Sequence, residues 1–221
     1  MVTGVVVVVA LVGVAVLGDA VLRNRVEASV AEEVAADLGA PRADVTIAGF
    51  PFVAQLVAGT LDRVEVSAPR ATVDGVRLDD VEATLLGVST GTPRTVEDMR
   101  LTASLDPAAL TAALPQGMTL EGESDRVTVH LDVLGVAIEA TLEPSAAGRS
   151  IGIALEELTV AGVSVRAGDL PFGIGDALTG LSIPLDGLPE GIELTDVRVA
   201  DGRIQVAAAG TGVVLPTATS G

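Results

Sequence analysis

Apolar and polar residues alternate with a period of two along most of the chain beyond Val45. Each alternating run is typical of a β-strand with one apolar and one polar face. Turn pairs such as Asp74-Gly75 and Asp201-Gly202 separate consecutive runs. We therefore predict an antiparallel meander of about ten strands. The runs are Val64–Ala68, Val81–Leu85, Met99–Leu105, Val127–Val133, Val136–Leu142, Ile151–Leu155, Ile192–Leu194, Val197–Val199 and Ile204–Val206.

The N-terminal stretch Val2–Leu17 contains no charged residue. As a helix it would span roughly 24 Å at 1.5 Å per residue, somewhat less than a hydrocarbon core of about 30 Å. This length fits the apolar region of a signal peptide or a short membrane anchor, and a buried core strand is the alternative. Small residues at Gly18 and Ala20 fit a signal-peptidase site. We expect residues 1–18 to export or anchor the protein.

An amphipathic helix is predicted from Asp19, as its cap, to about Leu38. Gly39 and Pro41 are typical of a helix end. The rest of the chain then forms one α+β domain over residues 19–215, followed by a flexible tail at 216–221. The apolar positions Leu22, Val26, Val30, Val34 and Leu38 recur every four residues.

Two short helices interrupt the strand pattern. One is predicted at Pro51–Ala58 and the other at Asp106–Leu114, each with proline near its start. The segment Leu114–Leu120 also resembles Leu188–Leu194, and each precedes a predicted hairpin. Two related halves would explain this likeness, and chance is the alternative.

The composition excludes several function classes. The chain is 49% hydrophobic and has no Cys, Trp or Tyr, so disulfides and thiol chemistry are excluded. All 13 basic residues are Arg, and the formal net charge is −17. Nucleic acid is therefore not an expected partner, because phosphate contacts need clustered basic residues. Any contact with lipid must rest on the burial of apolar surface.

The sequence offers little for catalysis. His130 is the only histidine and lies on the polar side of its predicted strand, so neither a zinc site nor a serine triad has a second candidate residue. Asp79-Asp80 and Glu156-Glu157 are adjacent in sequence, which directs their side chains to opposite strand faces. We therefore predict a protein without enzymatic activity, cofactor or metal. A hydrolase would have to depend on His130.

All three Phe occur in two similar motifs, Gly49-Phe50-Pro51-Phe52 and Leu170-Pro171-Phe172. We interpret them as the mouth of an apolar cavity that holds an acyl chain. Burying about 15 methylenes would contribute roughly 12 kcal/mol before the entropy losses of binding. Composition alone favours the alternative, an aliphatic face that packs only on itself. The hypothetical lipid-binding residues are Phe50, Pro51, Phe52, Leu56, Val57 and Phe172.

A headgroup site is predicted beside this mouth. The backbone amides at the start of the helix at Pro51 could donate hydrogen bonds to a phosphate. Arg42 and Arg63 are nearby in sequence and are the candidate cationic partners.

The stretch Gly49–Gly59, followed by Leu61–Val66, resembles the LmeA-like family of actinobacterial envelope proteins. The matching positions are Gly49, Phe50, Pro51, Phe52, Gln55, Leu56 and Gly59. The resemblance implies a periplasmic phospholipid-binding protein that supports the assembly of mannosylated inositol lipids, with a phosphatidylinositol-type phospholipid and the membrane as partners. It also implies a tubular lipid-binding fold and no catalytic residues.

Together these inferences predict an α+β fold in which a highly curved antiparallel β meander wraps a long N-terminal amphipathic helix. The predicted function is a non-enzymatic carrier or sensor of acyl lipids in the bacterial cell envelope. The alternative is an anchored β interaction module that scaffolds an envelope glycosyltransferase. A solid, dry core would favour that alternative.

Overall fold

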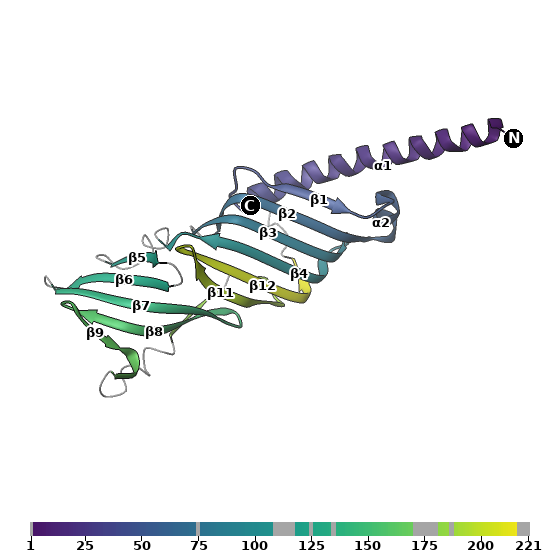
Figure 1. The fold of residues 1–221 in the computed structure, drawn as a ribbon. Helices are drawn as coiled ribbons and strands as arrows, with labels where there is room; N and C mark the ends of the chain where they lie inside the picture. Colours follow the sequence, from purple (N-terminus) through teal and green to yellow (C-terminus); the bar gives the residue numbers. More distant parts are fainter. Residues whose placement is uncertain are drawn as a thin grey trace.

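Two antiparallel β-sheets and one long helix make up the protein, which is elongated (Figure 1). The structure is a computed structural model and describes residues 2–73, 76–107, 118–123, 126–133, 136–169, 181–185 and 188–215. The helices are α1 (Val2–Asp37), α2 (Phe52–Ala58) and the short 3-10 helix η2 (Ala167–Asp169).

The first sheet has six strands in the order β1-β2-β3-β4-β12-β11. Its last two strands, β12 and β11, come from the C-terminal part of the chain. They join this sheet because β12 pairs with β4. The turn between them contains Asp201 and Gly202, both with positive φ, which confirms the hairpin predicted there. The strands are β1 (Asp44–Ala48), β2 (Thr60–Val73), β3 (Val76–Ser89), β4 (Thr95–Leu105), β11 (Ile192–Ala200) and β12 (Arg203–Val214).

The second sheet is built from the chain between β4 and β11. Its order is β10-β8-β7-β6-β5, with β9 also paired to β8. The strands are β5 (Met118–Glu123), β6 (Arg126–Val133), β7 (Val136–Ala147), β8 (Ser150–Val160), β9 (Val163–Arg166) and β10 (Leu181–Pro184).

Helix α1 is continuous from Val2 to Asp37, so the prediction that a helix begins at Asp19 is wrong. Asp19 lies inside α1 and cannot cap it. The helix ends before Gly39, which has a φ of 54°, as the sequence predicts. The N-terminal part of α1 extends beyond the first sheet, while its C-terminal part packs on β1 and β2 (Figure 1). Glu27 ties it to β1 by accepting a 2.6 Å hydrogen bond from the Ile47 amide.

The core lies on one face of the first sheet. Residues from its two edge strands, such as Val45 and Leu194, share one cluster of buried side chains. Val26, Val30 and Ala31 of α1 pack against this cluster. The structure therefore confirms a mostly antiparallel β fold with one long N-terminal helix. It does not confirm that a curved sheet wraps the helix, and the main contacts of α1 are with β1 and β2 at one edge.

Besides the core that they share through Val127, the two sheets are joined by polar and backbone contacts. The Leu194 amide of β11 donates a 2.7 Å hydrogen bond to the Gly148 carbonyl in the β7–β8 turn. The Arg149 guanidinium donates to three carbonyls in the segment that leads into β11, those of Leu188, Pro189 and Ile192. At Gly122 of β5, a Cβ atom would lie 2.1 Å from the carbonyl oxygen of Gly202, so only glycine allows this approach.

Some predictions concern residues outside the described ranges. These are the Asp74-Gly75 turn, the tail at 216–221, the Asp106–Leu114 helix beyond Pro107 and the Leu114–Leu120 repeat before Met118. Of the helices in the described part of the chain, none has the length and apolar content needed to cross a membrane. The signal peptide or anchor at residues 1–18 stays a prediction.

Candidate functional site

The Gly-Phe-Pro-Phe motif is held against α1 by one carboxylate. Asp19 accepts hydrogen bonds from the backbone amides of Phe52 (3.0 Å) and Val53 (2.8 Å), which lie at the start of α2. The residue is only 5% exposed. Asp19 therefore caps a helix 33 residues further along the chain.

Arg23, one turn further along α1, completes this contact. Its guanidinium lies 3.2 Å from Asp19 and donates a 2.6 Å hydrogen bond to the Gly49 carbonyl. It also lies 5.8 Å from the centre of the Phe52 ring, within range of a cation–π contact. Burial alone would raise the pKa of Asp19. The amides of Val53 and Phe52, together with the charge of Arg23, outweigh burial and hold the pKa below its ordinary value.

The headgroup site predicted at the start of α2 stays a prediction, and its expected donors have other partners in the structure. The two amides assigned to a phosphate already donate to Asp19. The predicted cationic partners are exposed and each pairs with a nearby carboxylate, Arg42 with Asp44 at 2.9 Å and Arg63 with Glu65 at 2.6 Å.

The polar and glycine positions of the motif have structural roles. The Gln55 side chain is buried, donates to the Ala48 carbonyl at 3.1 Å and accepts from the Asp62 amide at 2.8 Å. Gly49 has a φ of 98°, and a Cβ there would lie 2.4 Å from the Gln55 Nε2 atom. Gly59 ends α2 in the left-handed conformation, with a φ of 76°. The motif thus builds the connection between β1 and β2.

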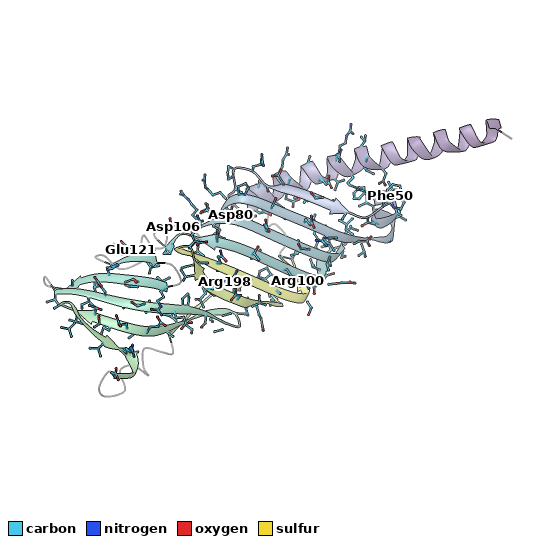
Figure 2. The ribbon with its side chains drawn as sticks, viewed as in Figure 1. Phe50, Asp80, Arg100, Asp106, Glu121 and Arg198 are labelled. Atoms are coloured by element: carbon cyan, nitrogen blue, oxygen red, sulfur yellow. The ribbon has the colours of Figure 1, made fainter. Side chains whose placement is uncertain are left out.

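The hypothetical lipid-binding residues separate into buried and exposed groups. Phe52 is fully buried in the core of the first sheet and is not at an open mouth, and its contact with lipid stays a prediction. Leu56 is half-buried against the same core. Pro51 is exposed, as are Phe50 (65%) and Val57 (85%), and Figure 2 shows Phe50 at the α2 end of the first sheet. Phe172 lies outside the described residues.

A second apolar surface, which the motif does not mark, runs across the second sheet. Directly paired residues of antiparallel strands share a face, and here the pairs are consistently aliphatic. Leu142 pairs with both Val127 and Leu155, for example. We call this surface the aliphatic face. It comprises Leu120, Val127, Val129, Leu131, Ile138, Ala140, Leu142, Ile151, Ile153, Leu155, Leu158, Val160, Val163 and Val165.

The aliphatic face is less completely buried than the core of the first sheet. Among its described residues only Val127 and Leu155 are buried, whereas Val160 and Val163 are 39% and 66% exposed. Most of the others are half-buried. Its inner end is continuous with the main core, because Leu120 and Ile151 pack against that core. Apolar side chains therefore extend from the closed first sheet onto a partly open second sheet.

A β-bulge preserves this face along β8. The register shifts between Thr141 and Leu142, so Glu156 is an extra residue between Leu155 and Glu157. Without a bulge, Leu155 and Leu158 would point to opposite faces. Glu156 instead pairs with Arg126 at 2.8 Å, which gives this carboxylate a structural role.

The polar side chains at other candidate positions are also paired. His130 lies 3.7 Å from both Glu121 and Glu139 on the polar side of the second sheet. Asp79 forms ion pairs with Arg70 and Arg203. No cluster of three or more potential metal ligands occurs within the described ranges.

Open hollows lie over the polar surfaces and at the junction of the sheets. One of about 560 Å³ is lined by Glu143–Ala146 of β7 and Thr195–Val199 of β11. Another, of about 370 Å³, lies over polar residues of β3, β4, β11 and β12. Phe50 and Phe52 line neither hollow. The predicted tunnel beside Phe50 and Phe172 therefore stays a prediction.

Fold and site together define an antiparallel β protein whose main chemical feature is a partly open aliphatic surface. The chain belongs to the LmeA-like phospholipid-binding family, whose family model matches residues 17–209. This match confirms the resemblance drawn from the Gly49–Val66 segment and supports lipid as a partner. Comparison with curated proteins and with solved structures found no match.

Proposed function

We propose that the protein is a non-enzymatic phospholipid carrier or sensor of the bacterial cell envelope, and that the aliphatic face of the second sheet holds the acyl chains. Membership of a phospholipid-binding family supports the ligand class. The resemblance extends the proposal to a phosphatidylinositol-type lipid and to support of lipoglycan (mannan) assembly.

The partial burial of the aliphatic face is the observation that carries this proposal. The residues are those of a protein core, yet most of them keep some exposure. Water in contact with such a surface is unfavourable by about 25 cal/mol for each Å². An acyl chain laid across β6, β7 and β8 would remove that contact without needing any polar partner.

The position of the aliphatic face also suits a lipid with two unlike ends. The face is continuous with the core at Leu120 and Ile151 and becomes exposed at Val160 and Val163. A chain could therefore enter at the exposed end with its tail directed toward the junction of the sheets. The opposite face of β7 carries Glu139 and Glu143, which would repel an anionic headgroup.

The test compares adjacent positions on opposite faces of β7. Leu142→Gln places an amide on the aliphatic face, and Thr141→Gln places the same group on the polar face. Both variants are purified without detergent, and the bound lipid is measured by native mass spectrometry and lipid extraction. We expect Leu142→Gln to retain roughly tenfold less lipid, since one leucine contact is worth about 1.5–3 kcal/mol. Thr141→Gln should match the unmodified protein.

Thermal unfolding of both variants shows whether the sheet remains folded. If the unmodified protein carries no lipid and takes none up from vesicles, the proposal fails. A folded Leu142→Gln variant with unchanged lipid content would exclude the aliphatic face as the site. An envelope glycosyltransferase bound by a lipid-free protein would instead favour the interaction module.

A further inference from the structure

Three stretches without a charged residue lie at one end of the first sheet, although the chain has a formal net charge of −17. They are distant in sequence: Val2–Gly18, Gly49–Leu61 and Ala83–Pro93. The amides of α2 bind Asp19, directly after the first stretch. The Thr90 amide donates a 3.0 Å hydrogen bond to the Gly59 carbonyl, which joins the second stretch to the third. We call this the uncharged end.

Aliphatic and aromatic side chains are exposed at the uncharged end. Phe50 is 65% exposed, and on α2 Val53 and Val57 are 44% and 85% exposed. Val53 and Val57 are four residues apart, so they lie on the same side of the helix. Next to Asp19, Val21 and Leu22 of α1 are 55% and 40% exposed. Val53 and Val57 are not among the positions that match the family motif. The segment between β1 and β2 therefore exposes these two side chains to solvent.

We propose that the uncharged end is a membrane-docking surface that seats in the headgroup region of a phospholipid bilayer. Exposed Phe and Val side chains on a short helix can be buried at the boundary between headgroups and acyl chains. The uncharged helical stretch Val2–Gly18 leaves the body at the same end (Figure 1). Both features would enter the lipid together.

The distribution of charge favours an orientation in which the uncharged end of the protein faces the bilayer. Anionic headgroups repel an acidic protein, and the repulsion falls off over about 10 Å at ordinary ionic strength. The three stretches place no charge of their own against the bilayer, and Asp62 and Glu97 lie beside them, against Gly49 and Gly87. Charged residues such as Asp80, Asp106 and Glu121 lie away from Phe50, toward the second sheet (Figure 2). Because no basic patch takes part, docking should persist when salt is raised.

The docking surface is distinct from the aliphatic face, which lies on the other sheet (Figure 1). The uncharged end would hold the protein on the bilayer whether or not that face carries a lipid. This inference thus goes beyond the proposed function and can fail separately from it.

The absence of cysteine allows a direct test with single labels. In the full chain, Val57→Cys labels the uncharged end and Ala137→Cys labels the polar face of the second sheet; both residues are exposed. Each variant carries an environment-sensitive fluorophore and is mixed with vesicles of equal parts phosphatidylcholine and phosphatidylglycerol. We expect a blue shift and a several-fold rise in emission at position 57, and no change at position 137.

A companion pair measures affinity by vesicle flotation. Val57→Asp should lower the bound fraction by about tenfold, as expected for the loss of one buried valine, while Ala137→Asp, on the polar face of β7, should remain within twofold of the unmodified chain. Failure of the full chain to float with vesicles would overturn the proposal. So would a bound chain whose label at 57 stays in water, or equal responses at 57 and 137. A lipid-free Leu142→Gln variant that still gives the signal at 57 would leave docking intact.

Discussion

At the residue scale, two Phe that are two positions apart have opposite environments. Phe52 is fully buried beside Arg23 and the core, whereas Phe50 is 65% exposed. The sequence places both in one motif, and only the fold separates them. Their energetic roles should therefore differ sharply.

We expect Phe52→Ala to lower the free energy of unfolding by about 3–5 kcal/mol, as is typical of a buried ring. Phe50→Ala should change it by less than about 0.5 kcal/mol, because an exposed ring leaves no cavity. Urea unfolding followed by circular dichroism measures both, since the chain has no Trp or Tyr to report by fluorescence. If both variants lost the same free energy of unfolding, the Phe50 ring would also have to pack in the core.

Asp19 should make the contact between α1 and α2 sensitive to acid. Its folded pKa lies below the ordinary 3.8, so its ionised form is favoured by folding. Its stabilising effect is therefore fully present above about pH 5 and is lost as the pH falls through the folded pKa. We expect the Tm difference between the unmodified protein and Asp19→Asn to be constant above that pH. The difference should shrink as the pH falls below 3.8 and through the lower folded pKa.

The comparison with Asp19→Asn matters because the chain has 30 acidic residues that also titrate in this range. Both proteins share all the others. A Tm difference that does not depend on pH would mean that the negative charge of Asp19 does not stabilise the contact.

At the element scale, the strands could be predicted because each has an aliphatic and a polar side. The run Met99–Leu105 lies within β4, and Val127–Val133 lies within β6. Periodicity reports which residues face a core, but it does not report which strand is the neighbour. The return of β12 to pair with β4, and the division into two sheets, therefore could not be read from the pattern.

The errors at the site have a similar physical origin. The sequence around Asp19 fits a helix start, but the apolar stretch before it continues the helix, and the carboxylate binds amides 33 and 34 residues away. Nothing local in the sequence marks such a partner. The Gln55 position of the motif was a usable signal, because a polar residue among apolar ones in a short helix often has a buried hydrogen-bonding role. The aliphatic face was visible as alternation, but its partial exposure depends on the tertiary fold.

At the scale of the whole molecule, two apolar surfaces lie at opposite parts of an elongated protein (Figure 1). One is the uncharged end beside α2, and the other is the aliphatic face of the second sheet. If the first seats on a bilayer and the second holds an acyl chain, the junction between the sheets fixes the distance between membrane and cargo. Its rigidity would then matter for function as well as for stability.

Arg149 is the residue on which we expect this rigidity to depend most. Its fork of N–H groups binds the carbonyls of Leu188, Pro189 and Ile192, next to the Leu194–Gly148 hydrogen bond. Arg149→Lys keeps the charge but loses the fork, because an ammonium is a compact point charge. We expect the Leu194 amide to exchange its hydrogen roughly tenfold faster, equivalent to losing about 1.4 kcal/mol of local protection.

Arg198→Lys is the matched control for this prediction. Arg198 lies on β11 itself, but its guanidinium binds Asp196 and Gln205 within the first sheet. This variant should leave exchange at Leu194 unchanged, because it removes no contact between the sheets. Amides of the β2–β3 pair, far from the junction, should be unaffected in both variants and serve as the internal reference. Equal exchange at Leu194 in the unmodified protein and in Arg149→Lys would mean that the backbone hydrogen bond and the close Gly122–Gly202 approach hold the sheets together without the arginine.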